Sequence, residues 1–124
     1  MPQPNFILLY VDNPILSTHF YADLLNLHAI ESSPTFSLFG LDSGLMLGLW
    51  SKHAALPRVQ AAAGAHELAF AVANQQTVEE WAIDWQERGI VLIQAPCQMD
   101  FGFTFVGLDP DGHRLRVFAP GSHP

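Results

Sequence analysis

The sequence repeats one order of elements on either side of a short alanine- and glycine-rich segment, AAAGA at 61–65. Before that segment, FILLYV (6–11) alternates as a strand does, and after it ELAFAV (67–72) shows the same pattern. Each half then closes on a similar strand, GLMLGLW (44–50) or GHRLRVF (112–118). An internal repeat of this length predicts two modules of similar design joined by a linker.

A helix is expected after the first opening strand. Asp12 or Asn13 can cap it, because both side chains accept hydrogen bonds from backbone N–H groups, and Pro14 suits its first position. The predicted apolar stripe is Leu16, Phe20 and Leu24.

A second helix is expected after the second opening strand. Thr77 and Glu80 have the spacing of a capping box, and Gly89 suits the C-terminal stop. The predicted stripe is Val78, Trp81 and Trp85, which would place both tryptophans against the outer side of the sheet.

Both modules are therefore predicted to have the order βαβββ within an α+β fold. The middle strands are expected in TFSLFGL (35–41), and in VLIQAP (91–96) or FGFTFVGL (101–108). A doubly wound α/β fold is disfavoured, because two helical segments are too few to cover both faces of a parallel sheet. At 124 residues the chain is expected to be a single domain, with module one at about 4–60 and module two at about 65–120.

Charge and cysteine content exclude several partners. The formal net charge is −7, which argues against nucleic acid and against anionic membrane surfaces, because both require a basic footprint. Cys97 is the one cysteine, so no internal disulfide can form, and MPQPNFILLYVDN has neither a basic leader nor a long apolar run. We expect a cytoplasmic protein that binds neither nucleic acid nor membrane.

The ordered motifs HFYADLLNL (19–27), HELAFAV (66–72) and DPDGHRLRVF (109–118) resemble the vicinal oxygen chelate superfamily, also called the glyoxalase/bleomycin-resistance/dioxygenase fold. The resemblance covers nearly the whole chain. It implies that each module curls its four strands into a half-open cup with the helix outside, and that the protein works as a homodimer.

A cup requires that alternate residues of each strand face opposite sides. The layer expected beneath the helices is Ile7, Leu9, Val11, Leu68, Phe70, Val72, Leu115 and Val117. The residues expected inside the cups are Phe6, Leu8, Tyr10, Met46, Gly48, Trp50, Glu67, Ala69, Ala71, Arg114, Arg116 and Phe118.

The resemblance also implies where a metal would be held. Metal-dependent members place ligands at four positions, which in this chain are Phe6, Gly48, Glu67 and Arg116. Only Glu67 can bind a metal, since the first two lack a donor atom and an arginine repels a cation. His66 is one residue too early to enter the cup unless the register slips by one. We therefore predict no metal and no cofactor.

Without a metal, the chain looks closest to the superfamily's antibiotic-binding branch, which sequesters phenazine, mitomycin or bleomycin. The resembling segments are LYV (9–11), GLWS (48–51) and DFGFTF (100–105), although Phe103 stands where a polar residue is expected. We predict a protein that binds a planar aromatic antibiotic without catalysis. The alternatives are an enzyme of the same fold with an atypical or absent metal site, with Glu67 as general base, and a partner-binding module with a filled cup.

Flat side chains suit a planar ligand, so the predicted ligand-binding residues are mostly aromatic. Trp50 is the first candidate because it ends a strand beside Ser51, where a ring can stack on a ligand at the rim. The full set is Trp50, Tyr10, Phe6, Phe36, Phe101, Arg116 and Glu67. Which way Phe36, Phe39, Phe101 and Phe105 face is left open.

The two arginines of the last strand need a separate explanation. A guanidinium left unpaired in a cup is costly, so Arg116 is expected to pair with Glu67 of the adjoining strand, and it could also contact a ligand carboxylate or carbonyl. Arg114, nearer the turn, is expected at the rim with its charged end in water.

Overall fold

The computed structural model describes residues 3–121. The chain divides into two compact units, one ending at Ala61 and the other beginning at Ala62. The boundary falls at the start of the alanine-rich segment that the sequence marks as a linker. Each unit is one βαβββ module and is described by itself.

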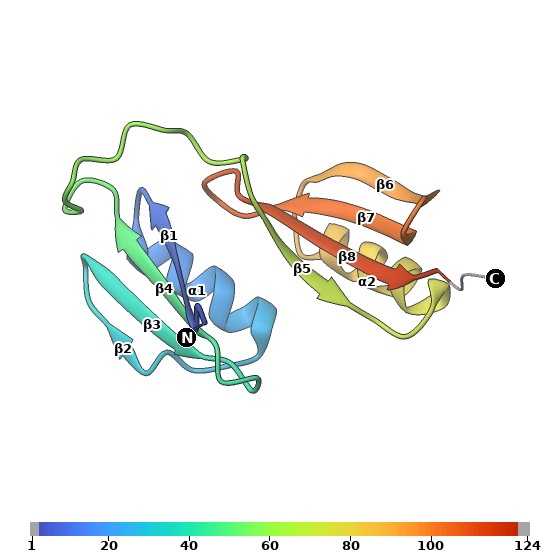
Figure 1. The fold of residues 1–124 in the computed structure, drawn as a ribbon, viewed down its shortest axis with the longest axis horizontal. Coiled ribbons are helices and arrows are strands. Elements are labelled where there is room, and N and C mark those ends of the chain that lie inside the picture. Colours follow the sequence, from blue (N-terminus) through green and yellow to red (C-terminus); the bar gives the residue numbers. More distant parts are fainter. Residues whose placement is uncertain (1–2, 122–124) are drawn as a thin grey trace. The chain divides into compact units, whose positions relative to one another are not determined.

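The first module contains β1 (Phe6–Val11), α1 (Pro14–Leu25), β2 (Glu31–Ser32), β3 (Phe36–Gly40) and β4 (Met46–Ser51). Its sheet has the order β1-β4-β3-β2, with β1 parallel to β4 and the other neighbours antiparallel. The helix lies on one face of this sheet (Figure 1).

The second module contains β5 (Glu67–Ala71), α2 (Gln75–Glu87), β6 (Leu92–Met99), β7 (Gly102–Leu108) and β8 (Arg114–Pro120). Its sheet order, β5-β8-β7-β6, repeats that of the first module, and β5 is again parallel to β8. Both sheets are mixed and open, and the helix covers one face (Figure 1). The predicted α+β fold of two tandem βαβββ modules is confirmed.

The turn before the last strand is the most closely repeated detail. In the second module the N–H of Asp109 donates to the carbonyl of His113, and the N–H of Gly112 donates to the carbonyl of Asp109. Sixty-eight residues earlier, Leu41 donates to Leu45 and Gly44 to Leu41 in the same way. Gly44 and Gly112 have φ of 93° and 91°, a left-handed conformation that favours glycine.

Helix α1 begins where the sequence predicts but buries a different face. Asn13 is the N-cap, its side chain accepting from the N–H groups of Ile15 and Leu16. The buried residues are Pro14, Ser17 and Tyr21, while Leu16 is 55% exposed, so the predicted stripe was wrong.

The reason is a polar contact between α1 and β3. The hydroxyl of Thr18 lies within hydrogen-bond distance of the Ser37 hydroxyl and of the Pro14 carbonyl. The buried side chains Ser17 and Ser37 therefore carry hydroxyl groups between helix and sheet, where an apolar stripe was expected. Hydrophobic periodicity cannot show such a contact because it scores these residues as polar.

Helix α2 begins earlier than the predicted capping box. Asn74 is the N-cap and accepts from the N–H of Thr77, so Thr77 lies inside the first turn and the capping-box prediction was wrong. The C-terminal stop is confirmed: Gly89 has φ of 83°, and the N–H of Ile90 reaches back to the carbonyl of Trp85. Within residues 3–121, neither helix has the length and hydrophobicity that a membrane-spanning segment requires.

The core of each module lies between the sheet and its helix. The fully buried side chains include Val11, Phe39 and Leu49 in the first module and Phe105, Leu115 and Val117 in the second. Phe39 and Phe105, whose facing the sequence leaves open, both belong to this layer.

The two tryptophans of α2 differ in burial. Trp85 is 3% exposed and makes edge-to-face contacts with Phe70 and Phe105, whereas Trp81 is 36% exposed and contacts Phe70. The prediction that both face the sheet therefore holds fully only for Trp85.

Replacement of these tryptophans should distinguish a fully buried core residue, Trp85, from a partly exposed one, Trp81. Trp85→Ala is expected to lower the free energy of unfolding by about 3–5 kcal/mol, because it removes a large side chain from a closed core. Trp81→Ala should cost only about 1–2 kcal/mol, since part of its ring is already in water. Urea unfolding followed by circular dichroism measures both values, and equal costs would contradict this description of α2.

Candidate functional site

Each sheet has one face beneath its helix and one face turned away from it. In β1 the odd-numbered residues Leu9 and Val11 are buried, while the even-numbered residues are exposed. In β8 the odd-numbered residues Leu115 and Val117 are buried, and Arg114, Arg116 and Phe118 are half-buried. The predicted division of each strand into a core side and a cup side is confirmed for these strands.

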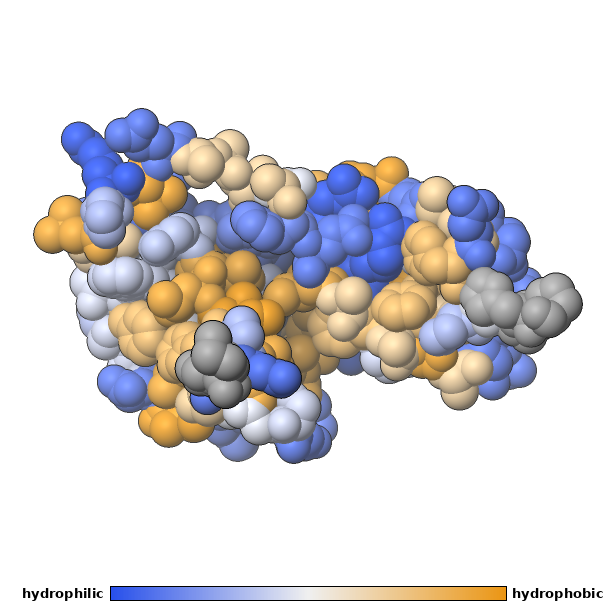
Figure 2. All heavy atoms as spheres, viewed as in Figure 1, coloured by the Kyte–Doolittle hydropathy of each residue, from blue (hydrophilic) through white to orange (hydrophobic). Residues whose placement is uncertain are grey.

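The first sheet face, defined by Phe6, Leu8, Tyr10, Phe36 and Trp50, is apolar and open. Phe6, Leu8 and Tyr10 are 42%, 42% and 38% exposed. Tyr10 and Trp50 are register partners, and Trp50 also pairs with Phe36 of β3, so Phe36 lies on the same side of the sheet. Figure 2 shows apolar side chains gathered over the region where β1 crosses α1 in Figure 1.

Trp50 and Tyr10 form the aromatic centre of this face. Their ring centroids are 6.1 Å apart and the ring planes are inclined at 36°. Trp50 is half-buried, so part of its ring remains accessible. Two neighbouring rings in this arrangement offer flat surface to a planar molecule.

The segment after Trp50 is held at the end of the sheet. The Nε2 of His53 lies 2.7 Å from Oδ1 of Asp12, which directly follows β1, and the N–H of Lys52 donates to the carbonyl of Val11. The hydrogen bond from His53 lowers the pKa of the exposed Asp12 carboxyl. These contacts fix the chain on the C-terminal side of Trp50, which belongs to β4.

Gly48 lies beneath the first sheet face. A Cβ atom built there would be 2.6 Å from Cδ2 of Leu8, 3.0 Å from Cε1 of Phe6 and 3.2 Å from Cε1 of Phe36. Three apolar side chains thus converge over the glycine and fill the space that a side chain at position 48 would need. The convergence makes the face continuous across β4.

The second sheet face has a different chemistry, because a carboxylate and two arginines lie on it. Glu67 on β5 accepts from Arg116 on β8 through both carboxylate oxygens: Nε to Oε1 at 2.7 Å and Nη2 to Oε2 at 3.1 Å. Figure 2 shows hydrophilic side chains over the beginning of β8 in Figure 1. The predicted pairing of Glu67 with Arg116 is confirmed.

Arg116 is fixed by further contacts on the same face. Its Nη1 donates to Oε1 of Gln94 and to Oγ1 of Thr104, each at 3.1 Å. The centre of the guanidinium lies 5.4 Å from the ring centroid of Phe101, which in turn makes an edge-to-face contact with Phe118. Phe101 therefore packs against the guanidinium of Arg116 and lies on the second sheet face.

Arg114 does more than the sequence indicates. Its Nη2 lies 3.0 Å from Oε2 of Glu67, so it is a second partner of the same carboxylate. The expectation that its charged end would lie in water at the rim holds only in part, because the side chain is 38% exposed but its Nη2 is paired. The cause is the register, which places Arg114 directly opposite Glu67 and Arg116 diagonally across from it.

The arginines set the electrostatics of this face. Hydrogen bonding by Arg116, followed by the charges of both arginines, lowers the pKa of Glu67 against the opposing effect of its partial burial. The carboxylate is therefore ionised at neutral pH. Two permanent cations and one anion leave this cluster with one net positive charge.

Sequence reasoning missed two residues that complete this cluster, Gln94 and Thr104. Thr104 also donates to the carbonyl of Val117, and both of its polar contacts depend on the pairing of β7 with β8. Gln94 lies between two register shifts of β6 against β7. A register irregularity of this kind leaves no periodic signal in a sequence.

The predicted ligand-binding residues fall into two groups. Phe6, Tyr10, Phe36 and Trp50 lie together on the first sheet face. The second sheet face brings together Glu67, Phe101 and Arg116. One group is aromatic and uncharged, and the other combines a cation with an aromatic ring.

The positions that would hold a metal do not fit one. Phe6 offers no donor atom, and the space around Gly48 is filled by apolar side chains. Arg116 is a cation that already occupies both oxygens of Glu67. No ligand set can be assembled from these four positions.

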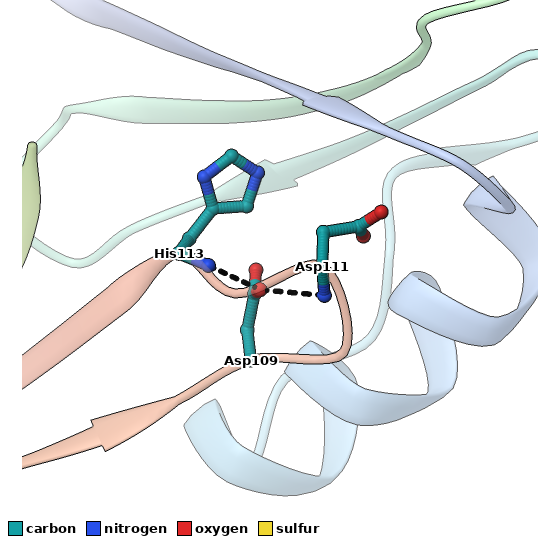
Figure 3. Close-up of side chains that lie close together, drawn as sticks. All are labelled: Asp109, Asp111 and His113. Atoms are coloured by element: carbon teal, nitrogen blue, oxygen red, sulfur yellow. Dashed lines mark hydrogen bonds between the residues drawn. The ribbon is translucent and has the colours of Figure 1, made fainter. Parts of the chain in front are cut away.

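A different group of possible ligands lies in the turn between β7 and β8. One ligand atom each from Asp109, Asp111 and His113 lies within 4.8 Å of the others. Figure 3 shows the Asp109 carboxylate directed at the backbone N–H groups of Asp111 and His113, and both distances are 2.9 Å. These bonds order the turn and account for the burial of Asp109, so we assign the group a structural role.

Paired βαβββ modules with open mixed sheets define a recognised class of small-molecule-binding and catalytic proteins. The chain belongs to the Glyoxalase/Bleomycin resistance protein/Dioxygenase superfamily, whose family model matches residues 3–117. The resemblance noted from the sequence is thereby confirmed.

Individual relatives agree with this membership. A protein of Agrobacterium tumefaciens solved by NMR is 49% identical with a TM-score of 0.91, covering 98% of this chain and 100% of that one. A glyoxalase-related enzyme from Fulvimarina pelagi shares the fold at 19% identity, with a TM-score of 0.81 and coverage of 96% and 88%. The phenazine antibiotic resistance protein EhpR of Enterobacter agglomerans is 28% identical over 121 residues, covering 92% of this chain and 89% of EhpR.

The lowered pKa of Glu67 predicts how stability depends on pH. Glu67→Gln should lower the free energy of unfolding at neutral pH by about 1–2 kcal/mol, because a partly exposed charged hydrogen-bond network is weakened. A depressed pKa in the folded state means that this contribution is present above the ordinary value of 4.5 and is lost as the pH falls through the folded value.

The difference in stability between wild type and Glu67→Gln should therefore stay constant from neutral pH to about pH 5 and shrink below it. Urea unfolding at a series of pH values measures this difference. A gap that widens on acidification would show that the Glu67 pKa is raised instead.

Proposed function

We propose that the protein binds a planar aromatic compound, such as an antibiotic, and confers resistance by sequestering it without a metal. The observation that carries this proposal is the open first sheet face, where Trp50 and Tyr10 lie beside exposed apolar side chains. The similarity to a phenazine antibiotic resistance protein supports the same ligand class.

The proposed mechanism is burial and stacking. A flat ring system placed on this face would cover apolar surface that is now exposed, and each aromatic pair adds roughly 0.5–1.5 kcal/mol beyond the area buried. The rings of Phe6 and Phe36 already pack over Gly48. They therefore lose little freedom on binding, which favours affinity. Nothing in this mechanism requires a chemical change in the ligand.

An enzyme of the same fold is the alternative. Its general base would be Glu67, but a carboxylate with a lowered pKa and three contacts to arginines is a weak base at neutral pH. The four positions for a metal also lack a ligand set, so a Lewis acid would need other residues. Both points favour binding over catalysis.

Trp50 tests the proposal directly. Phenazine should quench part of the tryptophan fluorescence, and Trp50→Ala should weaken its binding by about 1–3 kcal/mol, roughly tenfold to a hundredfold. Trp81→Ala is the matched control, because Trp81 is also partly exposed but lies on α2 beneath the opposite face of its sheet. It should leave the affinity for phenazine unchanged.

Two further readings complete this experiment. Phenazine recovered after prolonged incubation should be chemically unchanged by chromatography, and a chelator should not alter its affinity. Conversion of the compound would favour the enzyme. If Trp50→Ala unfolds the protein while the folded fraction binds as before, Trp50 is a core residue and the binding face lies elsewhere.

We also propose that the protein acts as a homodimer in the cytoplasm. Within their sheets, β1 and β5 are edge strands with regular pairing on one side, and exposed regular edges favour pairing with another chain. The opposite edge of the second sheet, β6, is interrupted by register shifts and by Pro96. A single cysteine, Cys97, that forms no disulfide within the chain is compatible with a reducing compartment.

Light scattering checks the dimer. At micromolar concentration the protein should have about twice the chain mass of 13.7 kDa. A mass of one chain across the concentrations used for ligand binding would show that the monomer is the functional unit.

A further inference from the structure

The second sheet face carries an excess of positive charge that its own contacts do not cancel. Arg114 and Arg116 share one carboxylate, that of Glu67. In a chain of net charge −7, such a local surplus needs an explanation. A lone ion pair holding two strands together would require only one of the two arginines.

The geometry brings two cationic amino groups to one point. The Nη2 of Arg114 and the Nη2 of Arg116 lie 3.0 Å and 3.1 Å from the same atom, Oε2 of Glu67. Each Nη2 carries two hydrogens, so each has one left after its bond to the carboxylate. An oxygen of a second anion could accept from both.

The rest of the cluster holds these donors in place. Four of the five N–H groups of Arg116 are engaged by Glu67, Gln94 and Thr104, and its plane is supported by the Phe101 ring. Its side chain is only 14% exposed, which reduces competition from water. Arg114 is less constrained, since its buried Nε has no hydrogen-bond partner within the described structure.

We propose that Arg114 and Arg116 form an acid-recognition site on the second sheet face, which takes the carboxylate, or an equivalent anionic group, of an aromatic compound. This inference rests on the proposed function and narrows its ligand class. Phe101 and Phe118 place aromatic surface of the same sheet face beside the arginines. Glu67 accepts from both guanidinium groups and offsets part of their positive charge.

A matched pair of compounds tests the inference. Phenazine and phenazine-1-carboxylate share one ring system, and only the second is ionised at neutral pH. Their dissociation constants for the full-length protein, measured by calorimetry, give a selectivity ratio. The wild-type protein should bind the carboxylate about tenfold more tightly.

Variants move this ratio in opposite directions. Arg114→Gln should bring it close to one, because a cation and its donors are lost from a half-exposed position. Glu67→Gln should raise it at least about threefold, because the competing negative charge disappears while the side-chain shape is kept. Arg88→Gln, which like Arg114→Gln removes one positive charge but at the C-cap of α2 beside Asp84, should leave the ratio unchanged.

The ratio is also insensitive to partial misfolding, because a smaller folded fraction lowers the apparent affinity for both compounds equally. Equal affinities for the two compounds, with no response of the ratio to Arg114→Gln or Glu67→Gln, would overturn the acid-recognition site and leave the proposed function intact. Binding of neither compound would overturn the proposed function and this inference with it.

Discussion

The parallel pairing of the first and last strands is the constraint on which both modules depend. Because β1 must run beside β4 in the same direction, the chain has to cross over one face of the sheet, and α1 makes that crossing. The second module has the same arrangement: β5 runs parallel to β8, and α2 makes the crossing. One face of each sheet is therefore covered by a helix, and the other is left for side chains that need contact with something outside the module.

The two open faces differ although their backbones agree. On the first, Gly48 allows Leu8, Phe6 and Phe36 to meet over β4, which produces an apolar surface without charge. On the second, Arg116 lies on the equivalent strand and donates hydrogen bonds to Glu67, Gln94 and Thr104. The same architecture thus supports a stacking surface in one half and a charged cluster in the other.

The sequence was sufficient for features set by local pattern and insufficient for those set by register. The repeat, the strand Phe6–Val11 and the Gly89 stop follow from alternation and from backbone preferences that single residues carry. The facing of Phe39 and Phe105 needed the strand pairing, because the bounds of β3 and β7 decide the parity.

The helix errors have related causes. At α2 the N-cap is Asn74, three residues before Thr77, although Thr77 and Glu80 also match a capping pattern. At α1 a contact between hydroxyl groups replaced the apolar stripe. In the charged cluster, the pair of Glu67 and Arg116 could be predicted from the energetic cost of leaving a buried guanidinium unpaired. The contact of Gln94 could not be predicted, because the irregular pairing of β6 with β7 decides where Gln94 lies.

The unequal outer strands have a consequence for how such a protein can diversify. The strand β2 has two residues and β6 has eight, yet the sheets keep one order and the same turn before the last strand. An edge strand is bonded to a single neighbour, so insertions there disturb one ladder and leave the core unaltered. Because β6 supplies Gln94 to Arg116, changes in its length offer an evolutionary route, and an engineering route, to new polar chemistry on an unchanged scaffold.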